Sequence, residues 1–438
     1  MATEDSKTAG AASTPATPPA RKSSWKMIGP GIVVAATGVG AGDLVSTLIA
    51  GSKYGYTLLW AAVIGCIVKI ALAEATGRWH LATGRTLFDG WRTLGRWTTI
   101  YFAVYVVIWG FVYGGTAMSS SGLPLAALFP GVLSLKAWAI ICGLSGLVFV
   151  WFNRYAVFEK VMTVLIGVMF VVVVYLAIRV TPDVGATFAG LVPVLPEGSV
   201  IYTLGLVGGV GGTITLAAYG YWVNAKGWTD SSWMKMMRLD NRVAYITTGI
   251  FVVAMLIVGA ELLHAGRIAL AEGDQGLIDL GKILEDRFGT FTANLFLVGF
   301  FAASYTSLIG VWQGVSLMFA DFVERIQAAR KGAEQSHTET AEATVRRERS
   351  MPFRLYVLWL TFPPMTLLWL EQPFGLVIVY GALGAFFMPF LALTLIWLLN
   401  SSRTPREWRN GIVSNVLLAA SGLLFIALCV QQVRELPW

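Results

Sequence analysis

Long runs of apolar residues, each about 20 residues in length, recur along this chain of 438 residues. An α-helix of about 20 residues spans the hydrocarbon core of a bilayer. Only 13% of the residues are charged, about half of the ~25% that soluble domains carry on average. The pattern excludes an ordinary soluble globule and predicts an all-α polytopic membrane protein. The 17 Trp and 14 Tyr fit this class, because their rings favour the membrane–water interface.

Eleven membrane spans are predicted from these runs. They follow an N-terminal tail (residues 1–26) whose Ala, Thr, Ser and Pro content is typical of disorder. We place the spans at 27–51, 55–77, 97–121, 137–152, 158–178, 201–224, 243–263, 289–318, 353–371, 373–400 and 411–431.

The basic residues are distributed unequally between the two sides of the membrane. With the N-terminus in the cytoplasm, 23 of the 32 Lys and Arg lie in the tail and loops of that side and seven lie on the other. This asymmetry follows the positive-inside rule. We therefore expect a multi-pass protein of the cell (inner) membrane, with a cytoplasmic N-terminus and the C-terminus on the opposite side. The lipid bilayer accounts for the net charge of +7, so no nucleic-acid partner is predicted, and the oligomeric state stays open.

Two of the spans contain clusters of glycine. The first span has Gly38, Gly40 and Gly42 within residues 37–43, and the sixth has four glycines within 208–212. Glycine costs about 1 kcal/mol relative to alanine in a helix interior, and an opened backbone survives in a membrane only inside protein or beside a wet cavity. Close helix packing is the alternative explanation for one such cluster.

The spacing of the two clusters favours interrupted helices. Five spans separate them, so residues 27–178 and 201–400 form two halves of opposite orientation with corresponding breaks, and 411–438 adds an eleventh helix. This arrangement is typical of transporters with inverted repeats, in which the substrate site lies where the breaks meet.

Several stretches of the chain resemble the natural resistance-associated macrophage protein (Nramp) family. They cover most of the chain between Gly29 and Asn415. The resemblance implies a LeuT-type fold of eleven or twelve helices, built as a 5+5 inverted repeat plus one extra helix, with substrate bound between unwound helices 1 and 6. The matching residues are Gly29-Pro30-Gly31, the segment 51–60, Thr83-Gly84-Arg85, Gly115-Thr116-Ala117, Ala302-Ala303 and Met388-Pro389-Phe390.

The family's functional motifs are absent from the matching positions. Gly40-Ala41-Gly42-Asp43 stands where the family has Asp-Pro-Gly-Asn, and Thr215-Leu216-Ala217 stands where it has Met-Pro-His. Trp109 and Val112 stand at the positions of an Asp and a Glu implicated in proton movement, and Phe387 replaces a Gln. The resemblance therefore implies a divergent branch without the sulfur ligand that selects soft metals and without canonical proton coupling.

Asp43 is the one carboxylate left at the presumed substrate site. A charge inside the membrane is costly, which makes Asp43 a functional candidate; the alternative is a cap on the second half of the broken helix. Oxygen donors beside one carboxylate suit a hard divalent cation, Mg²⁺ foremost and Mn²⁺ next, although single hydroxyls also bond within their own helix. The predicted substrate-binding residues are Asp43, Gly40, Ala41, Gly42, Thr213, Thr215 and Tyr219, with Asp43 and Thr215 as metal ligands.

Aromatic residues in the same spans support a second hypothesis, in which the substrate is a small organic solute. Rings beside a carboxylate hold organic cations through cation–π contacts, although an aromatic stripe also serves as packing. The predicted cavity residues are Trp109, Tyr113, Tyr305, Gln313 and Phe387. A third hypothesis is a sensor or scaffold that binds without transport.

Other charges receive simpler interpretations. Glu74 and Arg78 lie four residues apart and are predicted to pair on a helix face, at a position that the resemblance links to a cytoplasmic gate. Lys69 is expected to snorkel or to pair with a neighbouring helix. The loop at 321–352, in particular from 323 to 352, is expected to be a flexible or weakly helical connector with a solvated charged face.

No enzyme motif is present in the sequence. A nucleophile elbow, a P-loop and a dinucleotide fingerprint are all missing, so we predict no catalytic residues and no cofactor. Without a P-loop in the chain, movement of a substrate is expected to be secondary transport.

Overall fold

The chain is helical throughout the computed structural model, which describes residues 29–152, 155–209, 212–264, 275–331, 340–370 and 373–434. All eleven predicted spans coincide with helical structure, and the expected disordered tail lies outside the described residues. The spans are formed by α1 (Pro30–Gly38) with α2 (Ala41–Tyr54), α3 (Leu59–Thr83), α5 (Arg96–Leu128), α6 (Leu135–Phe152), α7 (Tyr155–Arg179), α9 (Val200–Gly209) with α10 (Thr215–Ala225), α11 (Met234–Gly259), α13 (Thr290–Arg330), α15 (Met351–Thr361) with the 3-10 helix η4 (Pro363–Leu370), α16 (Pro373–Asn400) and α17 (Ile412–Arg434).

Short helices connect the spans. They are α4 (Leu87–Leu94), α8 (Val184–Ala189), η2 (Ser231–Trp233), the π-helical η3 (Ala260–His264), α12 (Gln275–Phe288), α14 (Ala341–Glu348) and η5 (Arg406–Trp408). Within the described residues, eight helices are long and apolar enough to cross a membrane. The other three predicted spans are the two interrupted ones and α16.

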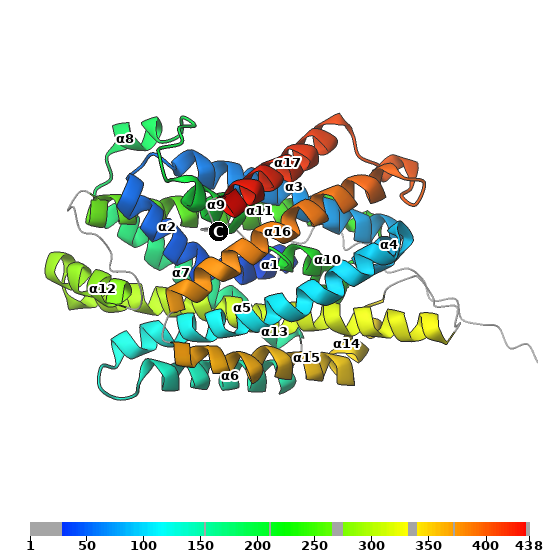
Figure 1. The fold of residues 1–438 in the computed structure, drawn as a ribbon, viewed down its shortest axis with the longest axis horizontal. Coiled ribbons are helices and arrows are strands. Elements are labelled where there is room, and N and C mark those ends of the chain that lie inside the picture. The colour runs from blue at the N-terminus through cyan, green and yellow to red at the C-terminus, as the bar shows by residue number, and fades with distance from the viewer. Residues whose placement is uncertain are drawn as a thin grey trace, which may run out of the picture.

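The first span lies inside the bundle. In Figure 1, α6 and α15 form one side, α3 and α17 lie toward the opposite side, and α1 and α10 lie between them. Contacts of α1 with α7, α10, α11 and α13 surround it, and Val33 and Val34 have no solvent exposure. A helix that is apolar all round is suited to such a position.

The connecting helices gather at two opposite ends. Figure 1 shows α8 and α12 at one end of the bundle and α4 and α14 at the other. The charge distribution predicts that the α4 and α14 end faces the cytoplasm, and we call it the α14 end.

The loop at 323–352 was expected to be a flexible or weakly helical connector with a solvated charged face; the part that the structure describes is largely helical, and the expectation of a solvated face is wrong for Arg325 and Arg347. α13 continues to Arg330, and α14 packs against α10, α13 and α15. Arg325 and Arg347 are only 3% and 4% exposed, because both pair with carboxylates of the bundle. Because α14 docks through ion pairs, its sequence shows no helical periodicity of apolar residues.

Candidate functional site

The first span is interrupted near the middle of the bundle. α1 ends at Gly38 and α2 begins at Ala41, with Gly40 between them in an extended conformation (φ −104°, ψ −172°). The predicted break is therefore confirmed. The hydroxyl of Ser307, on α13, donates a 2.7 Å hydrogen bond to the carbonyl oxygen of Thr37, one of the carbonyls that a helix end leaves without a helical partner.

A second hydroxyl reaches this break from α5. The side-chain oxygens of Tyr113 and Ser307 are 2.7 Å apart; because Ser307 gives its one proton to Thr37, Tyr113 is the donor. The ring of Trp109 stacks on Tyr113 with centroids 4.6 Å apart, and the ring of Tyr380 lies 5.1 Å from Tyr113. The structure thus brings the predicted residues Trp109 and Tyr113 to the first break.

The sixth span is also interrupted, as predicted. α9 ends at Gly209 and α10 begins at Thr215. Gly212 has φ +89°, a conformation that favours glycine. A Cβ atom added to Gly212 would lie 3.1 Å from the Cα of Gly38, so the two breaks meet.

Lys69 joins α3 to the break of the sixth span. Its side chain has no solvent exposure, and its Nζ donates to the carbonyl oxygens of Gly208, at 2.8 Å, and of Gly212. The Nζ atom lies 3.9 Å from Sδ of Met388 on α16. Lys69 therefore pairs with a neighbouring helix, as one of the two expectations had it, and does not snorkel.

Two predicted ligands on the sixth span are buried at the same place. Thr213 and Thr215 are 4% and 2% exposed, and neither hydroxyl has a hydrogen-bond partner within the described part of the chain. Thr213 packs against Gly384 of α16. The side chains of Ala41 and Asp43 lie outside the described residues, although both belong to the first turn of α2.

The other predicted ligand and one cavity residue lie further along their helices. The hydroxyl of Tyr219 donates to Oδ2 of Asp240 at 3.1 Å. Gln313 lies between Trp222, whose indole N–H donates to its Oε1 at 2.6 Å, and Glu348, which accepts from its Nε2 at 3.0 Å. These contacts connect α10 and α13 to α11 and α14 rather than to the two breaks.

The remaining cavity residues pack elsewhere. The hydroxyl of Tyr305 lies 2.9 Å from Oγ of Ser145 on α6. Phe387 is fully buried and stacks on Tyr105, with centroids 5.0 Å apart.

An unpredicted carboxylate fixes the start of α1. Asp240, on α11, accepts hydrogen bonds from the backbone N–H groups of Gly29 at 3.0 Å and Gly31 at 2.5 Å. These N–H groups belong to the helix end that attracts negative charge. Sequence reasoning missed Asp240 because the seventh span was expected to begin at 243, three residues later.

A buried ion-pair cluster holds the α14 end. Asp321 lies 2.9 Å from both Arg325 and Arg347, and Arg325 lies 2.7 Å from Asp89 on α4. Tyr221 of α10 donates to Asp321 at 2.7 Å. We call Asp89, Asp321, Arg325 and Arg347 the inner cluster; it ties α4, α10, α13 and α14 together.

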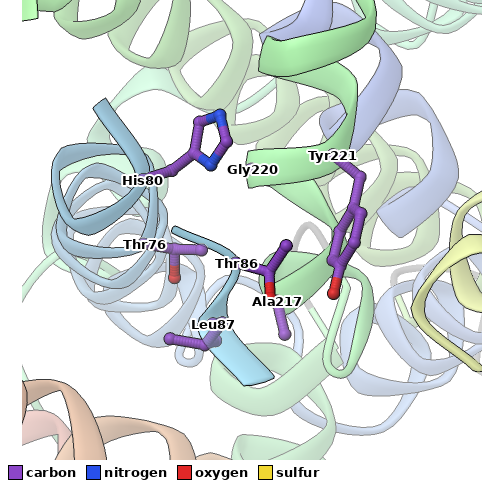
Figure 2. Close-up of a pocket in the computed structure, with 7 residues that line it drawn as sticks. All are labelled: Thr76, His80, Thr86, Leu87, Ala217, Gly220 and Tyr221. Carbon is purple, nitrogen blue, oxygen red and sulfur yellow. The ribbon is translucent and has the colours of Figure 1, made fainter. Parts of the chain in front are cut away.

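A small cavity lies between α3 and α10 beside this cluster (Figure 2). Its lining on α10 runs from Ala217, two residues after Thr215, to Tyr221, which also reaches Asp321. It thus occupies part of the interval between the break of the sixth span and the inner cluster. The residues around it are Thr76, His80, Thr86, Leu87, Ala217, Gly220 and Tyr221.

Two further carboxylates, those of Glu74 and Glu348, lie at the α14 end. Glu74 lies 3.1 Å from Arg78, which confirms the predicted pair, and 2.9 Å from Arg238; Arg78 also donates to Asn410 at 2.8 Å. Burial raises the pKa of Glu348, on α14, to about 7.

Comparison with known sequences identifies one family over almost the whole chain. The pattern of the Natural resistance-associated macrophage protein-like family (Nramp) matches residues 31–434. A divalent metal cation transporter, MntH, of Granulibacter bethesdensis is 26% identical over 67% of this chain and 68% of its own length. The metal transporter Nramp3.1 of Populus trichocarpa is 26% identical over 67% of this chain, which spans less than two thirds (61%) of that protein.

Solved structures share the fold at low sequence identity. A crystal structure of the Eremococcus coleocola manganese transporter matches with a TM-score of 0.72 at 16% identity, over 95% of this chain and 88% of that one. Mhp1, a nucleobase-cation-symport-1 family transporter, matches with a TM-score of 0.58 at 15% identity over 94% and 93% of the chains. The LeuT-type fold is confirmed, and the same fold serves transporters of different substrates.

Proposed function

Because the chain belongs to the Natural resistance-associated macrophage protein-like (Nramp) family, we propose that it is a secondary transporter that moves a divalent metal cation by alternating access. The observation that carries the proposal is the meeting of the two breaks, where Gly212 approaches Gly38. In transporters with broken helices, free backbone groups at such a point bind the substrate and coupling ions. The relatives named above are metal transporters, not enzymes.

The donor atoms support a hard metal ion. Thr213 and Thr215 offer two buried hydroxyls at the sixth-span break, and Asp43 lies on the first turn of α2. Among the described residues, no group of three or more His, Cys, Asp or Glu is placed to hold a metal. Oxygen ligands with one carboxylate favour Mg²⁺ and then Mn²⁺, each keeping part of its water shell.

The same region supports transport without canonical proton coupling. Trp109 and Val112 stand where the family resemblance places an Asp and a Glu, and neither side chain carries a proton that titrates. The driving force in this proposal is the metal gradient and the membrane potential.

We place the cytoplasmic gate at the α14 end. The inner cluster, with Tyr221, holds α4, α10, α13 and α14 together there, beside the cavity that Figure 2 shows. Glu74 pairs with Arg78 on α3 and with Arg238 on α11. Opening toward the cytoplasm requires these ion pairs to separate or to move as a unit.

A small organic solute, cationic or polar, is the second candidate substrate. The stacked rings of Trp109 and Tyr113, with Tyr380 beside them, lie next to the first break and offer faces to a cation. A sensor or scaffold that binds without transport is the third candidate.

Uptake into proteoliposomes tests the proposal. Mg²⁺, Mn²⁺ and Ca²⁺ are supplied outside, with a metal dye inside and the internal pH followed in parallel. We expect saturable influx of Mg²⁺ or Mn²⁺ without internal acidification. No influx of any metal into liposomes that hold folded protein would contradict the proposal and leave organic solutes to be screened; binding without influx would favour the sensor.

The role of Asp43 has its own test. Asp43→Ala is expected to reduce metal uptake at least about tenfold, because it removes the carboxylate of the site. The control Asp286→Ala removes an exposed carboxylate on α12 and is expected to leave uptake unchanged. Equal uptake by both variants would show that Asp43 is not a ligand.

Thr215→Met tests the selectivity argument. A thioether in place of the hydroxyl is expected to raise uptake of Cd²⁺ or Mn²⁺ relative to Mg²⁺, because sulfur prefers softer ions. An unchanged ratio would count against Thr215 as a ligand.

A further inference from the structure

Lys69 is a charged side chain in the interior of a membrane span. It lies near the middle of α3 (Leu59–Thr83), with no solvent exposure. A charge in that environment is costly unless the surroundings compensate it. The groups that compensate the charge of the ammonium group therefore indicate which kind of ion this site binds.

Backbone carbonyls contribute to this compensation. The oxygens of Gly208, in the last turn of α9, and of Gly212, in the break, accept its hydrogen bonds. The carbonyl end of a helix carries partial negative charge, and an ended helix leaves these oxygens without helical partners. Sδ of Met388 is a third, weaker acceptor at 3.9 Å.

The conformation of Gly212 holds this arrangement in place. Its positive φ turns the backbone at the break, and its Cα lies against Gly38 of α1, where a Cβ would approach to 3.1 Å. The ammonium of Lys69 therefore bonds directly to the residue at which the two breaks meet. A change at Lys69 acts on the geometry of that contact.

We infer that the carbonyl end of α9 is a binding site for a monovalent cation, and that the chain fills this site with its own Lys69 ammonium. Carbonyls of interrupted helices bind cations in this way in transporters and channels, and a lysine ammonium is a compact monovalent cation with three donors. The broken sixth span consequently needs no dissolved Na⁺ or K⁺ to keep its shape. This second cation site is separate from the metal site proposed above and does not depend on the substrate being a metal.

Chemical rescue tests the inference on detergent-purified protein in choline buffer. Lys69→Ala removes the atoms of one n-propylammonium ion and leaves room for it. We expect the Tm of Lys69→Ala to fall by about 3–6 °C, because buried carbonyls lose their donor, and to recover with millimolar n-propylammonium. The uncharged n-propanol, which has the same shape, is expected not to restore it.

Matched controls use the wild type and Lys53→Ala. The ammonium of Lys53 lies at the end of α2 beside Tyr202 rather than at a helix break. Neither protein is expected to respond to n-propylammonium, and the Tm of the wild type is expected not to change when Na⁺ or K⁺ replaces choline.

Three results would overturn the inference. They are a Tm of Lys69→Ala that n-propylammonium leaves unchanged, equal rescue by n-propanol, and a wild-type Tm that rises with Na⁺ or K⁺. If Lys69→Ala does not fold, Lys69→Met is measured instead, because it keeps the volume of the side chain without the charge. A Tm of Lys69→Met equal to that of the wild type would also overturn the inference. These readouts are independent of uptake, so failure of the proposed transport function would be seen separately.

Discussion

The two helix breaks occupy corresponding positions in the two halves of the chain, yet their free carbonyls are satisfied differently. At the first break a neutral hydroxyl, that of Ser307, donates to Thr37 and is itself held by Tyr113. At the sixth-span break the ammonium of Lys69 donates to Gly208 and Gly212. One break is held by neutral hydroxyl donors and the other by a positive charge.

This difference separates the tasks of the two breaks. A divalent ion and an ammonium group repel each other, and the repulsion is stronger inside a protein than in water. The metal is therefore expected on the first-span side, and the carboxylate of Asp43 is needed to offset the repulsion. The two halves of the chain thus supply two similar breaks, and we propose that single side chains decide which of them binds the substrate.

The largest effect is expected from removing the fixed charge. Lys69→Met keeps the volume of the side chain but leaves the carbonyls of Gly208 and Gly212 without their donor, which costs about 1–3 kcal/mol per unsatisfied group. We expect Mn²⁺ uptake by proteoliposomes to fall at least about tenfold, because the loss of the break's geometry outweighs the relief of the repulsion between Lys69 and the metal. Lys53→Met is the control, and equal uptake by the two variants would remove the contrast between the breaks.

A smaller effect is expected at the neutral break. Ser307→Ala removes both hydrogen bonds of its hydroxyl and is expected to reduce uptake by roughly 5- to 10-fold, which corresponds to a loss of about 1–1.4 kcal/mol. Tyr113→Phe removes only the outer bond and keeps the ring stacked on Trp109, so its effect should be smaller. If Tyr113→Phe reduced uptake more than Ser307→Ala, the assignment of Ser307 as the donor to Thr37 and of Tyr113 as the donor to Ser307 would be wrong.

The smallest effect concerns the α14 end, where a group titrates near neutral pH. Burial raises the pKa of Glu348 from 4.5 to about 7, so the docked helix α14 holds a proton that a free carboxyl would lose. Docking is therefore strongest below about pH 4.5 and weakens as the pH rises through about 7. Hydrogen exchange of the α14 amides, corrected for intrinsic rates, should be faster at pH 8 than at pH 6.

The control for this prediction is Glu348→Gln, which keeps an acceptor for Gln313 and does not titrate. Its corrected exchange rates should be the same at both pH values. A wild-type protein whose α14 exchanges equally at pH 6 and pH 8 would contradict the role of Glu348.

Sequence reasoning found the breaks because glycine clusters act locally. The low helix propensity of the segments 37–43 and 208–212 follows from their own glycines and does not depend on any packing partner. The spans were accessible for the same reason, since apolar length is a local property, whereas the LeuT-type fold was implied by the family resemblance.

The partners across the bundle were not accessible in this way. Nothing near Lys69 in the sequence indicates that the end of α9 lies against α3, 139 residues away. Arg325 and Arg347 were interpreted as part of a solvated face, because Arg325 meets Asp89, and Arg347 meets Asp321, only in the folded bundle. Tyr219 and Gln313 were placed in the site by their spans, but their side chains point to Asp240 and Glu348.

The central claim is that a divalent cation binds where the breaks meet, on the side of the first span. Anomalous diffraction from crystals soaked in Mn²⁺ tests it most directly. The account predicts an anomalous peak within coordination distance of the Asp43 carboxylate and of an oxygen from the sixth-span break, lost in Asp43→Ala crystals. A peak that persists in Asp43→Ala, or one found only on the protein surface, would contradict the claim.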